Sequence, residues 1–252
     1  MVELKNISKN YGETQVLKGL TLNIEKGKIT TFVGANGAGK STLLNIIGRL
    51  MKSTTGQILI EGECISQIKD ADMAKKIAFL KQSNFINVKL TIRELVSFGR
   101  FPHSKGRLNK TDIEEINKAI SYLGLEEIQH KYLNEVSGGQ KQRAFIAMVV
   151  AQDTKYILLD EPLNNLDMKH SVQIMKTLRK LVDELGKTII LVIHDINFAS
   201  CYSDNIVALK DGELVKVGRV CEIVEEDNLR NVFGLDFNVQ EVNNCKICLY
   251  YK

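Results

Sequence analysis

The chain has 252 residues, and its 34 Lys and Arg against 30 Asp and Glu give a formal net charge of +4. With 44% hydrophobic and 25% charged residues, the composition is that of an ordinary globular protein, which excludes a disordered chain and a coiled coil. The positive excess is too small to favour a nucleic-acid partner, for which clustered basic residues are expected.

No apolar stretch approaches the roughly 20 residues that a membrane-spanning helix needs. The longest candidates, residues 144–151 and 188–193, are instead predicted to be a core helix and a core strand. The N-terminal residues lack the basic start and apolar block of a secretory signal, and Val2 excludes myristoylation. We therefore expect a cytoplasmic chain that reaches a membrane only through a partner.

The first third of the chain is predicted to be rich in strands. Leu20, Leu22 and Ile24 alternate with polar residues, and residues 29–33 form a continuous apolar run. A further strand pair is expected around residues 56–65.

The middle of the chain is predicted to be helical. Residues 91–94 and 111–114 each begin with Thr and end with Glu, the spacing of a capping box. Gly124 suits the C-terminus of the second of these helices, and a third helix is expected from residues 137–139 to about Gln152. We interpret residues 83–152 as a helical lobe inserted into the fold.

The last third alternates strands and helices. A buried strand at residues 156–159, an amphipathic helix at 168–185 and a strand at 188–193 are followed by a hairpin at 206–217. Short apolar strands separated by helices predict an α/β fold, with a parallel sheet covered on both faces. A small strand pair is expected around Asn243 and Asn244.

The cysteines favour no disulfide framework, because there are five of them and they are scattered. Cys245 and Cys248 form a C-x-x-C pair, which could be a redox pair or half of a zinc site. The alternating sequence around them favours an ordinary strand, on which residues three apart point to opposite faces. No second Cys or His pair stands nearby, so we favour the strand without a metal or redox role.

A phosphate-binding loop is predicted at residues 34–41, which read G-x4-G-K-S between an apolar strand and a helix expected at 42–50. Its glycines allow successive backbone N–H groups to face inward and, with the helix N-terminus, to bind phosphates. Lys40 would neutralise phosphate charge, and the Ser41 hydroxyl can ligate Mg²⁺.

Polar residues follow two of the predicted strands. Asp160 and Glu161 end one strand, and His194 with Asp195 follows the next. Ligands of open parallel sheets bind at the carboxyl ends of the strands. Asp160 could therefore hold Mg²⁺ through water, Glu161 could polarise an attacking water, and His194 could lie beside the terminal phosphate.

A second anion site is predicted where residues 137–139, Ser-Gly-Gly, begin a helix. The same tetrapeptide with Gln140 could also be an N-cap followed by flexible glycines. One chain therefore has two candidate phosphate-binding helix starts.

Together these motifs, in this order, resemble the ATPase subunit of an ATP-binding-cassette (ABC) transporter over nearly the whole chain. The resemblance rests on the adenine-stacking aromatic Tyr11, the Walker A loop at 34–42, the Q-loop residue Gln82, the signature at 136–140, the Walker B strand at 156–160 with Glu161, the D-loop at 164–167, and the switch histidine His194. The signature has Val for the usual Leu, and the D-loop has Asn164 and Asn165 for Ser and Ala, which leaves the role of Asn164 open.

The resemblance implies a P-loop NTPase fold of the ABC type, with an antiparallel β subdomain and an inserted α-helical subdomain. It implies a domain at 1–235, a C-terminal β tail at 236–252, and a head-to-tail dimer of two copies that share ATP and Mg²⁺. The implied catalytic residues are Glu161, His194, Lys40 and Gln82. The implied metal ligands are Ser41, Gln82 and Asp160. The implied nucleotide contacts are Tyr11, Gly34, Asn36, Gly37, Ala38, Gly39, Lys40, Ser41, Thr42, Gln82, Asp160, Ser137, Gly138, Gly139, Gln140 and Asp167.

Residues 91–102, 161–170 and 194–200 resemble the ATPases of iron–siderophore, haem and cobalamin importers, and overall the chain is most similar to the petrobactin-type ferric siderophore group. This implies two membrane permeases, an extracytoplasmic substrate-binding protein and a place on the cytoplasmic face of the membrane. We expect the permease to contact the lobe that contains Gln82 and residues 98–107, including Arg100 and Phe101. A haem or cobalamin importer, a soluble ABC ATPase and a non-enzymatic ATP clamp are the alternatives.

Overall fold

The computed structural model describes residues 1–82, 88–164 and 166–251. The chain forms two compact units. The first unit combines Met1–Ile68 with Thr188–Lys252, and the second unit is Lys69–Lys187. The predicted division into residues 1–235 and a tail from 236 stays a prediction.

An antiparallel sheet begins the first unit. Its strands are β1 (Val2–Tyr11), β2 (Thr14–Ile24), β4 (Thr55–Ile60) and the short β5 (Glu63–Cys64), in the order β2-β1-β4-β5. The alternating Leu20, Leu22 and Ile24 are all buried on β2, as predicted. The period-two pattern places them on one face of the sheet.

A second group of strands in the first unit is largely parallel. β3 (Ile29–Val33) lies between β8 (Thr188–Val192) and β9 (Asn205–Lys210) and is parallel to both, while β10 (Glu213–Arg219) is antiparallel to β9. Every residue of β3 and β8 is buried. This continuous burial explains why both sequences are rich in apolar and β-branched residues and lack a polar–apolar alternation. The helices α1 (Lys40–Ile47) and α8 (Ile196–Tyr202) follow β3 and β8.

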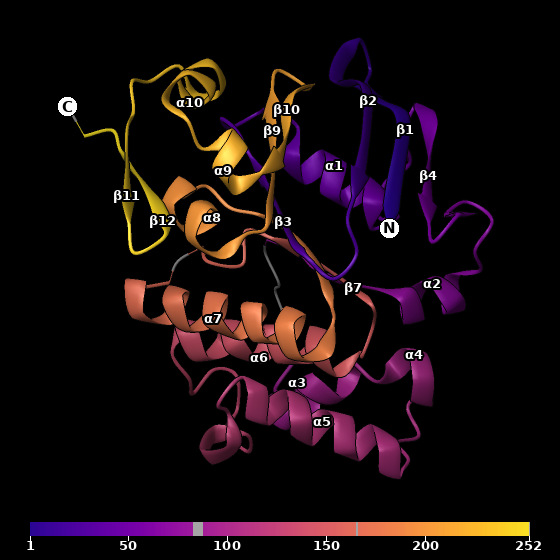
Figure 1. Cartoon of the computed structure of the whole chain (residues 1–252). Coiled ribbons are helices and arrows are strands. Elements are labelled where there is room, and N and C mark those ends of the chain that lie inside the picture. Colours follow the sequence, from indigo (N-terminus) through magenta and orange to yellow (C-terminus); the bar gives the residue numbers. More distant parts are fainter. Residues whose placement is uncertain (83–87, 165, 252) are drawn as a thin grey trace. The chain divides into compact units, whose positions relative to one another are not determined.

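The C-terminal part of the first unit consists of α9 (Val220–Ile223), α10 (Glu226–Phe233) and the hairpin of β11 (Asn238–Val242) and β12 (Cys245–Leu249). The hairpin turns at Asn243 and Asn244, as predicted, and lies beside α8 (Figure 1). The backbone N–H of Cys248 donates to Asn197 Oδ1 on α8 over 2.7 Å.

The C-x-x-C pair lies on β12, as predicted. Burial raises the pKa of Cys248 to about 11 and that of Cys201, on the adjacent α8, to about 12. A thiol with such a pKa is rarely ionised near neutral pH, and the thiolate is the reactive form. Within the described residues, no three His, Cys, Asp or Glu side chains are grouped so that they could hold a metal ion.

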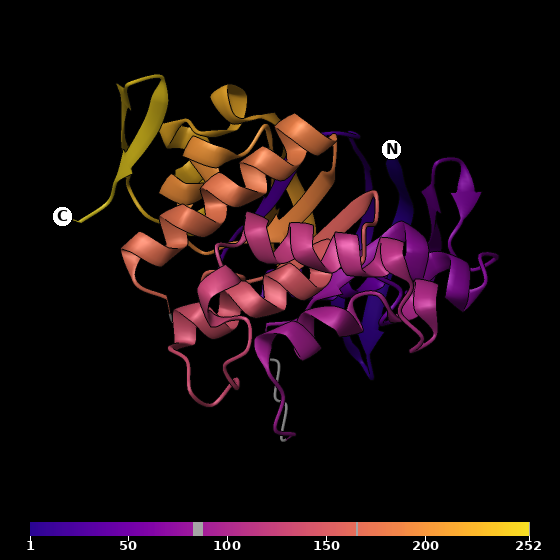
Figure 2. The same cartoon turned by 90° about the horizontal axis from the view of Figure 1, so that it is seen from below.

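The second unit contains most of the helices. In chain order its elements are α2 (Asp70–Lys76), β6 (Ile77–Leu80), α3 (Ile92–Phe98), α4 (Phe101–Ser104), α5 (Lys110–Tyr122), the 3₁₀ turn η1 (Glu126–Ile128), α6 (Gly138–Ala151), β7 (Tyr156–Asp160) and α7 (Met168–Leu185). The helices α3, α5 and α6 pack against one another (Figures 1 and 2), and β6 pairs with β7 in parallel. No helix among the described residues is both long and apolar enough to span a bilayer.

Two predicted capping boxes have different outcomes. Thr91 caps α3 together with Glu94, as predicted. The predicted box of Thr111 with Glu114 is wrong, because Asn109 caps α5 in a box with Asp112, two residues earlier in the chain. Asn accepts the N3 N–H at least as well as Thr, and the extended backbone of Asn109 suits the N-cap position.

A buried ion pair holds the helices of the second unit together. Arg100 Nε lies 2.9 Å from Asp112 Oδ1 and its Nη1 donates to the carbonyl of Ala151 over 2.9 Å, while Arg100 is 5% exposed and Asp112 1%. The expectation that Arg100 faces a permease is therefore wrong. Phe98 and Phe101, which are 53% and 60% exposed, remain on the surface.

We predict that Arg100→Ala destabilises the protein by about 3–5 kcal/mol, because it leaves the buried Asp112 carboxylate without its cation. Urea denaturation at neutral pH measures this loss, with Phe101→Ala as the exposed neighbouring control. A cost for Arg100→Ala no larger than that of the control would contradict the structural role.

The same ion pair predicts a pH dependence. The backbone N–H of Asn109, the largest cause, and then the Arg100 guanidinium lower the pKa of Asp112 below the ordinary value of an aspartate. A carboxylate whose pKa is lower in the folded state than in the unfolded state stabilises the protein fully at pH values above its unfolded-state pKa. This stabilisation is lost as pH falls through the folded-state pKa. The cost of Arg100→Ala should therefore shrink below about pH 4 in urea titrations, and a cost that stays constant in acid would exclude the carboxylate as its origin.

Candidate functional site

The loop of residues 34–41 has a backbone that only glycine permits at two positions. Gly34 and Gly39 have φ values of 146° and 94°. A Cβ on Gly34 would lie 2.1 Å from the carbonyl oxygen of Leu209, and one on Gly39 would lie 2.5 Å from Leu17 Cδ2. The loop therefore curls against β9 and β2 as closely as a chain without side chains allows.

Lys40 is buried at the centre of this loop. It is 5% exposed, and its Nζ donates to the carbonyls of Gly34 over 2.7 Å and Ala35 over 2.9 Å. The helix α1 begins at Lys40, and its N-cap Gly39 has no side chain with which to cap it. A helix start directed into a loop with a fixed cation has the chemistry of a phosphate site. The residues present therefore fit a nucleotide phosphate chain.

The strand register brings His194 to the same edge of the first unit. Phe32 on β3 pairs with Val192 on β8 in parallel, so the chain enters the loop at Gly34 and reaches His194 at neighbouring strand ends. His194 is exposed, and Asp195 after it caps α8 by accepting from the N–H of Asn197 over 2.8 Å. The predicted adjacency of the two strand ends is confirmed.

Tyr11 lies at the end of β1 with a ring that is 48% exposed. Its hydroxyl donates to Met51 Sδ over 2.9 Å, and Lys9 Nζ lies 5.3 Å from the ring centroid. The ring is therefore fixed at its polar end while much of its surface remains accessible.

The second unit contains the candidate catalytic carboxylate. All five residues of β7 are buried, and Glu161 directly after it is 8% exposed with φ of 51°. Leu80 on β6 pairs with Leu159 on β7, which brings Gln82 and Glu161 together two residues beyond this pair. Gln82 Nε2 donates to Glu161 Oε2 over 2.6 Å. The parallel register thus joins two residues that stand 79 positions apart.

Asn164 donates from Nδ2 to the same oxygen, Glu161 Oε2. Sequence reasoning left the role of Asn164 open, because a motif comparison shows only that it departs from the usual D-loop. The contact arises from the turn after β7, which returns the side chain of residue 164 to residue 161. Asn165, the other departure, lies outside the described residues.

The residues of the predicted signature begin α6. Ser137 Oγ accepts from the N–H of Gln140, which confirms the N-cap interpretation, and Gln140 Oε1 accepts from the N–H of Ser137 over 3.0 Å, which completes a capping box. Gly138 has open space around it, whereas a Cβ on Gly139 would lie 3.0 Å from the ring of His170. One glycine therefore leaves the helix start accessible and the other allows α7 to approach.

Asp167 of the D-loop caps α7. Its Oδ1 accepts from the N–H of His170 over 2.8 Å, and its Oδ2 lies 2.8 Å from His170 Nδ1. The backbone N–H of His170 is the largest cause that lowers the pKa of Asp167. His170 thus touches both the D-loop and the signature glycine, a link that its place in the sequence does not indicate.

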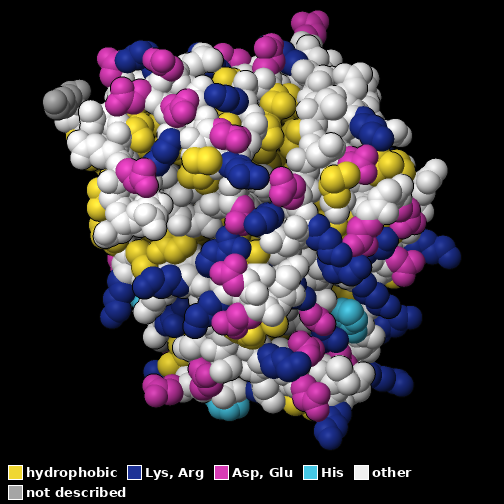
Figure 3. Space-filling view, viewed as in Figure 1, with side chains coloured by type: hydrophobic (Ala, Val, Ile, Leu, Met, Phe, Trp, Pro, Cys, Tyr) yellow, Lys and Arg dark blue, Asp and Glu magenta, His cyan; other side chains and the backbone are white. Residues whose placement is uncertain are grey.

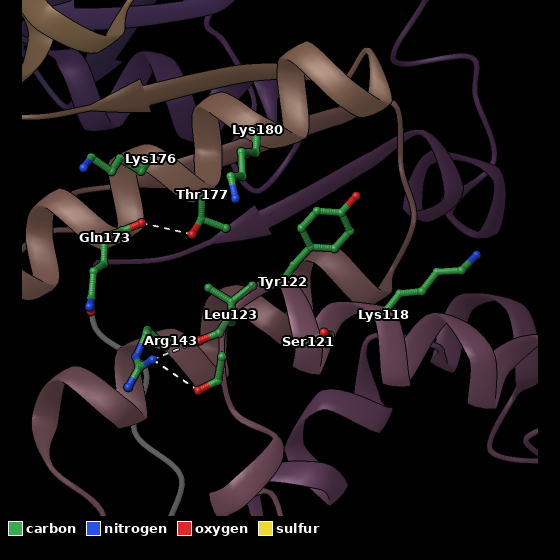
Figure 4. A pocket seen from close by; sticks show the side chains of 10 residues that line it. Lys118, Ser121, Tyr122, Leu123, Arg143, Gln173, Lys176, Thr177 and Lys180 are labelled. Atoms are coloured by element: carbon green, nitrogen blue, oxygen red, sulfur yellow. Dashed lines mark hydrogen bonds between the residues drawn. The ribbon is translucent and has the colours of Figure 1, made fainter.

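A separate groove of about 600 Å³ lies in the second unit, between α5, α6 and α7 (Figure 4). Lys118, Arg143 and Lys180 are among its lining residues. Lys118 is 2.6 Å from Glu115, and Arg143 donates to the carbonyls of Leu123 and Gly124 at the end of α5. The Lys118 pair lies within α5, whereas Arg143 joins α6 to the end of α5. Acidic side chains are interspersed with basic ones over the face seen in Figure 3. The groove is not the predicted phosphate site.

Comparison with known proteins agrees with these features. The family model described as "ABC transporter" matches residues 17–164, which include the glycine loop, the signature and the turn after β7, and the chain belongs to this family. It is 58% identical to the petrobactin import ATP-binding protein YclP of Bacillus subtilis over 100% of both chains. It is 41% identical to the iron(3+)-hydroxamate import ATP-binding protein FhuC of the same organism, over 96% of this chain and 91% of that one.

Among solved structures, the dimeric post-hydrolysis state of the ATP-binding cassette MJ0796 bound to ADP and Pi superposes with a TM-score of 0.77. That protein is 36% identical, and the match covers 87% of this chain and 99% of that one. The predicted family and fold class are therefore confirmed.

Proposed function

We propose that this protein is the ATP-hydrolysing subunit of an importer of ferric siderophores, working on the cytoplasmic face of the membrane. The observation that carries the proposal is the pairing, in one chain, of a phosphate loop around buried Lys40 with a buried carboxylate, Glu161, held by Gln82. In the proposal, the loop binds a nucleotide and the carboxylate activates the water that hydrolyses it.

The loop and α1 bind the phosphates of ATP, and the exposed ring of Tyr11 stacks on the adenine. Lys40 stabilises negative charge that develops on the terminal phosphate, because its ammonium is already fixed by two carbonyls. The contacting residues in the loop are Gly34, Asn36, Gly37, Ala38, Gly39, Ser41 and Thr42.

Ser41, Gln82 and Asp160 offer hydroxyl, amide and carboxylate oxygens, the hard donors that Mg²⁺ prefers. In the proposal these three side chains would hold the ion, which supplies further neutralisation of phosphate charge when it is bound. Glu161 accepts a proton from the attacking water, and His194 orients the terminal phosphate.

Two copies act together in the proposal. The helix start at Ser137, Gly138, Gly139 and Gln140 of one copy closes on the nucleotide held by the loop of the other, with Asp167 at the same interface. The exposed Ser137 and Gly138 support this arrangement, as does the dimeric state of the solved cassette described above.

The transported substrate is inferred from relatives. YclP and FhuC are named for import of petrobactin and of iron(3+)-hydroxamate, both ferric siderophore systems, so we propose the same substrate class here. Import further requires two membrane permeases and an extracytoplasmic substrate-binding protein. The exposed Phe98 and Phe101 offer an apolar surface for the permease.

We predict that Glu161→Gln binds ATP normally but hydrolyses it about 10²–10⁴-fold more slowly, because the water loses its proton acceptor. The variant should also accumulate as an ATP-bound dimer. Phosphate release and size-exclusion chromatography with ATP measure both effects, with Glu114→Gln on α5 as the exposed control. Near-normal turnover would remove Glu161 from the catalytic role.

We predict that Lys40→Ala weakens ATP binding about 10–100-fold, since charge-assisted hydrogen bonds to phosphate are lost. Ser137→Arg should keep ATP binding but block closure of the shared site. Mixing the two variants should recover part of the activity, because one of the two shared sites then has both intact halves. Ser137→Ala controls for loss of the α6 cap, and an inactive mixture of folded, exchanging proteins would contradict the head-to-tail dimer.

We predict that Phe101→Glu uncouples transport while sparing ATP hydrolysis, because it places a charge on the proposed permease surface. Uptake of iron–siderophore by cells and hydrolysis by the purified subunit are measured in parallel. Ile113→Glu, at a 43% exposed position on α5, is the matched control. Unchanged uptake would place the coupling surface elsewhere, and equal loss of both activities would indicate an unfolded lobe.

A further inference from the structure

The turn that follows β7 returns Asn164 to the carboxylate of Glu161. The backbone N–H of Asn164 donates to the carbonyl of Glu161 over 3.2 Å, and the side-chain Nδ2 donates to Glu161 Oε2. On the opposite side, Gln142 of α6 donates from Nε2 to the carbonyl of Pro162 over 3.0 Å. The turn is therefore closed on itself and fixed to α6, and its geometry presents an amide to the carboxylate.

Two amides from separate segments meet on one carboxylate oxygen. Gln82 reaches Oε2 from the end of β6, and Asn164 reaches it from the turn. A glutamate carboxylate can rotate about its side-chain bonds, and two donors at one oxygen restrict that rotation. Asn164 itself is exposed, whereas Glu161 is 8% exposed. An accessible amide therefore donates its hydrogen bond to a buried carboxylate instead of to solvent.

The two donors differ in how they are attached. Asn164 is three residues from Glu161 in the same hydrogen-bonded turn and moves with it. Gln82 belongs to a different strand end, and in the proposed function its amide oxygen also serves the metal. We therefore expect the contact from Asn164 to persist if Gln82 reorients toward the metal.

We propose that Asn164 is a positioning residue that holds the Glu161 carboxylate through Oε2 in the orientation for proton transfer from water. It acts through Glu161 and touches neither ATP nor the water. The residue type fits this role, since an amide supplies a donor without charge. An aspartate of the same shape would replace the donor with a second negative group beside Glu161. The inference rests on the proposed catalytic role of Glu161.

The test is a double-mutant cycle of Asn164→Ala and Glu161→Gln, with kcat and KM for ATP hydrolysis measured on the full-length protein. Asn164→Ala should lower kcat by about tenfold with little change in KM, as expected for loss of one hydrogen bond to a charged group. In the Glu161→Gln background the same change should leave the residual rate unaltered, because the carboxylate it positions is gone.

Two further variants separate positioning from folding. Asn164→Asp preserves the shape of the side chain and should lower kcat more than Asn164→Ala, whereas a space-filling role would make it the milder change. Asn117→Ala, which removes an exposed amide that accepts from Arg93 on α3, should leave kcat unchanged. Circular dichroism and thermal unfolding establish that each variant is folded.

Each result is decisive. An unchanged kcat in Asn164→Ala, or an equal loss with and without the Glu161 carboxylate, would overturn the positioning role while leaving the proposed function intact. Normal turnover of Glu161→Gln alone would instead overturn the proposed role of Glu161. A lower kcat confined to the background with Glu161 supports the inference.

Discussion

The constraint on which the second unit depends is the burial of an ionisable carboxylate at the end of an apolar strand. Transferring such a group from water is unfavourable unless hydrogen-bond donors replace the lost solvent. The fold supplies them by register: Leu80 beside Leu159 places Gln82 next to Glu161, and the turn after β7 adds Asn164. The apolar strands β6 and β7 therefore do more than form part of the hydrophobic core, because their pairing determines which polar side chains meet at the edge of the sheet.

The first unit also buries a charged group, which in this unit is positive. Lys40 is a buried cation, and two carbonyls of the glycine loop accept from its ammonium. That arrangement requires the backbone to curl back, which in turn requires glycine where a Cβ would strike β9 or β2. The sequence pattern G-x4-G-K-S thus reflects the backbone conformation that the loop needs. The parallel pairing of β3 with β8 places His194, which follows β8, at the same sheet edge as the loop, which follows β3.

How much of the fold and of the candidate site could be predicted from the sequence depends on how far apart in the chain the interacting residues stand. The strands β2, β3 and β8 and the helix after the loop could be predicted, since period and local spacing determine them. The cap of α5 could not, because Thr111 and Asn109 offer equally plausible side chains and only the backbone angles choose between them. Arg100 resembles a surface cation in the sequence, and its partners Asp112 and the Ala151 carbonyl become neighbours only when three helices pack. Asn164 was visible as a departure from a motif, but its contact depends on a turn with Glu161 at positive φ.

The helix α6 links the two candidate sites of one chain. Its first turn carries Ser137 and Gly139, which in the proposed dimer face the nucleotide of the other copy, and Gly139 abuts His170, the partner of Asp167. One turn later Gln142 binds the carbonyl of Pro162, the residue after Glu161. In the proposed dimer, a shift of α6 on closure over one nucleotide would therefore reach the turn after Glu161 through one hydrogen bond. Both neighbours are met within the first two turns of α6, so the proposed dimer face and the turn after Glu161 share one helix.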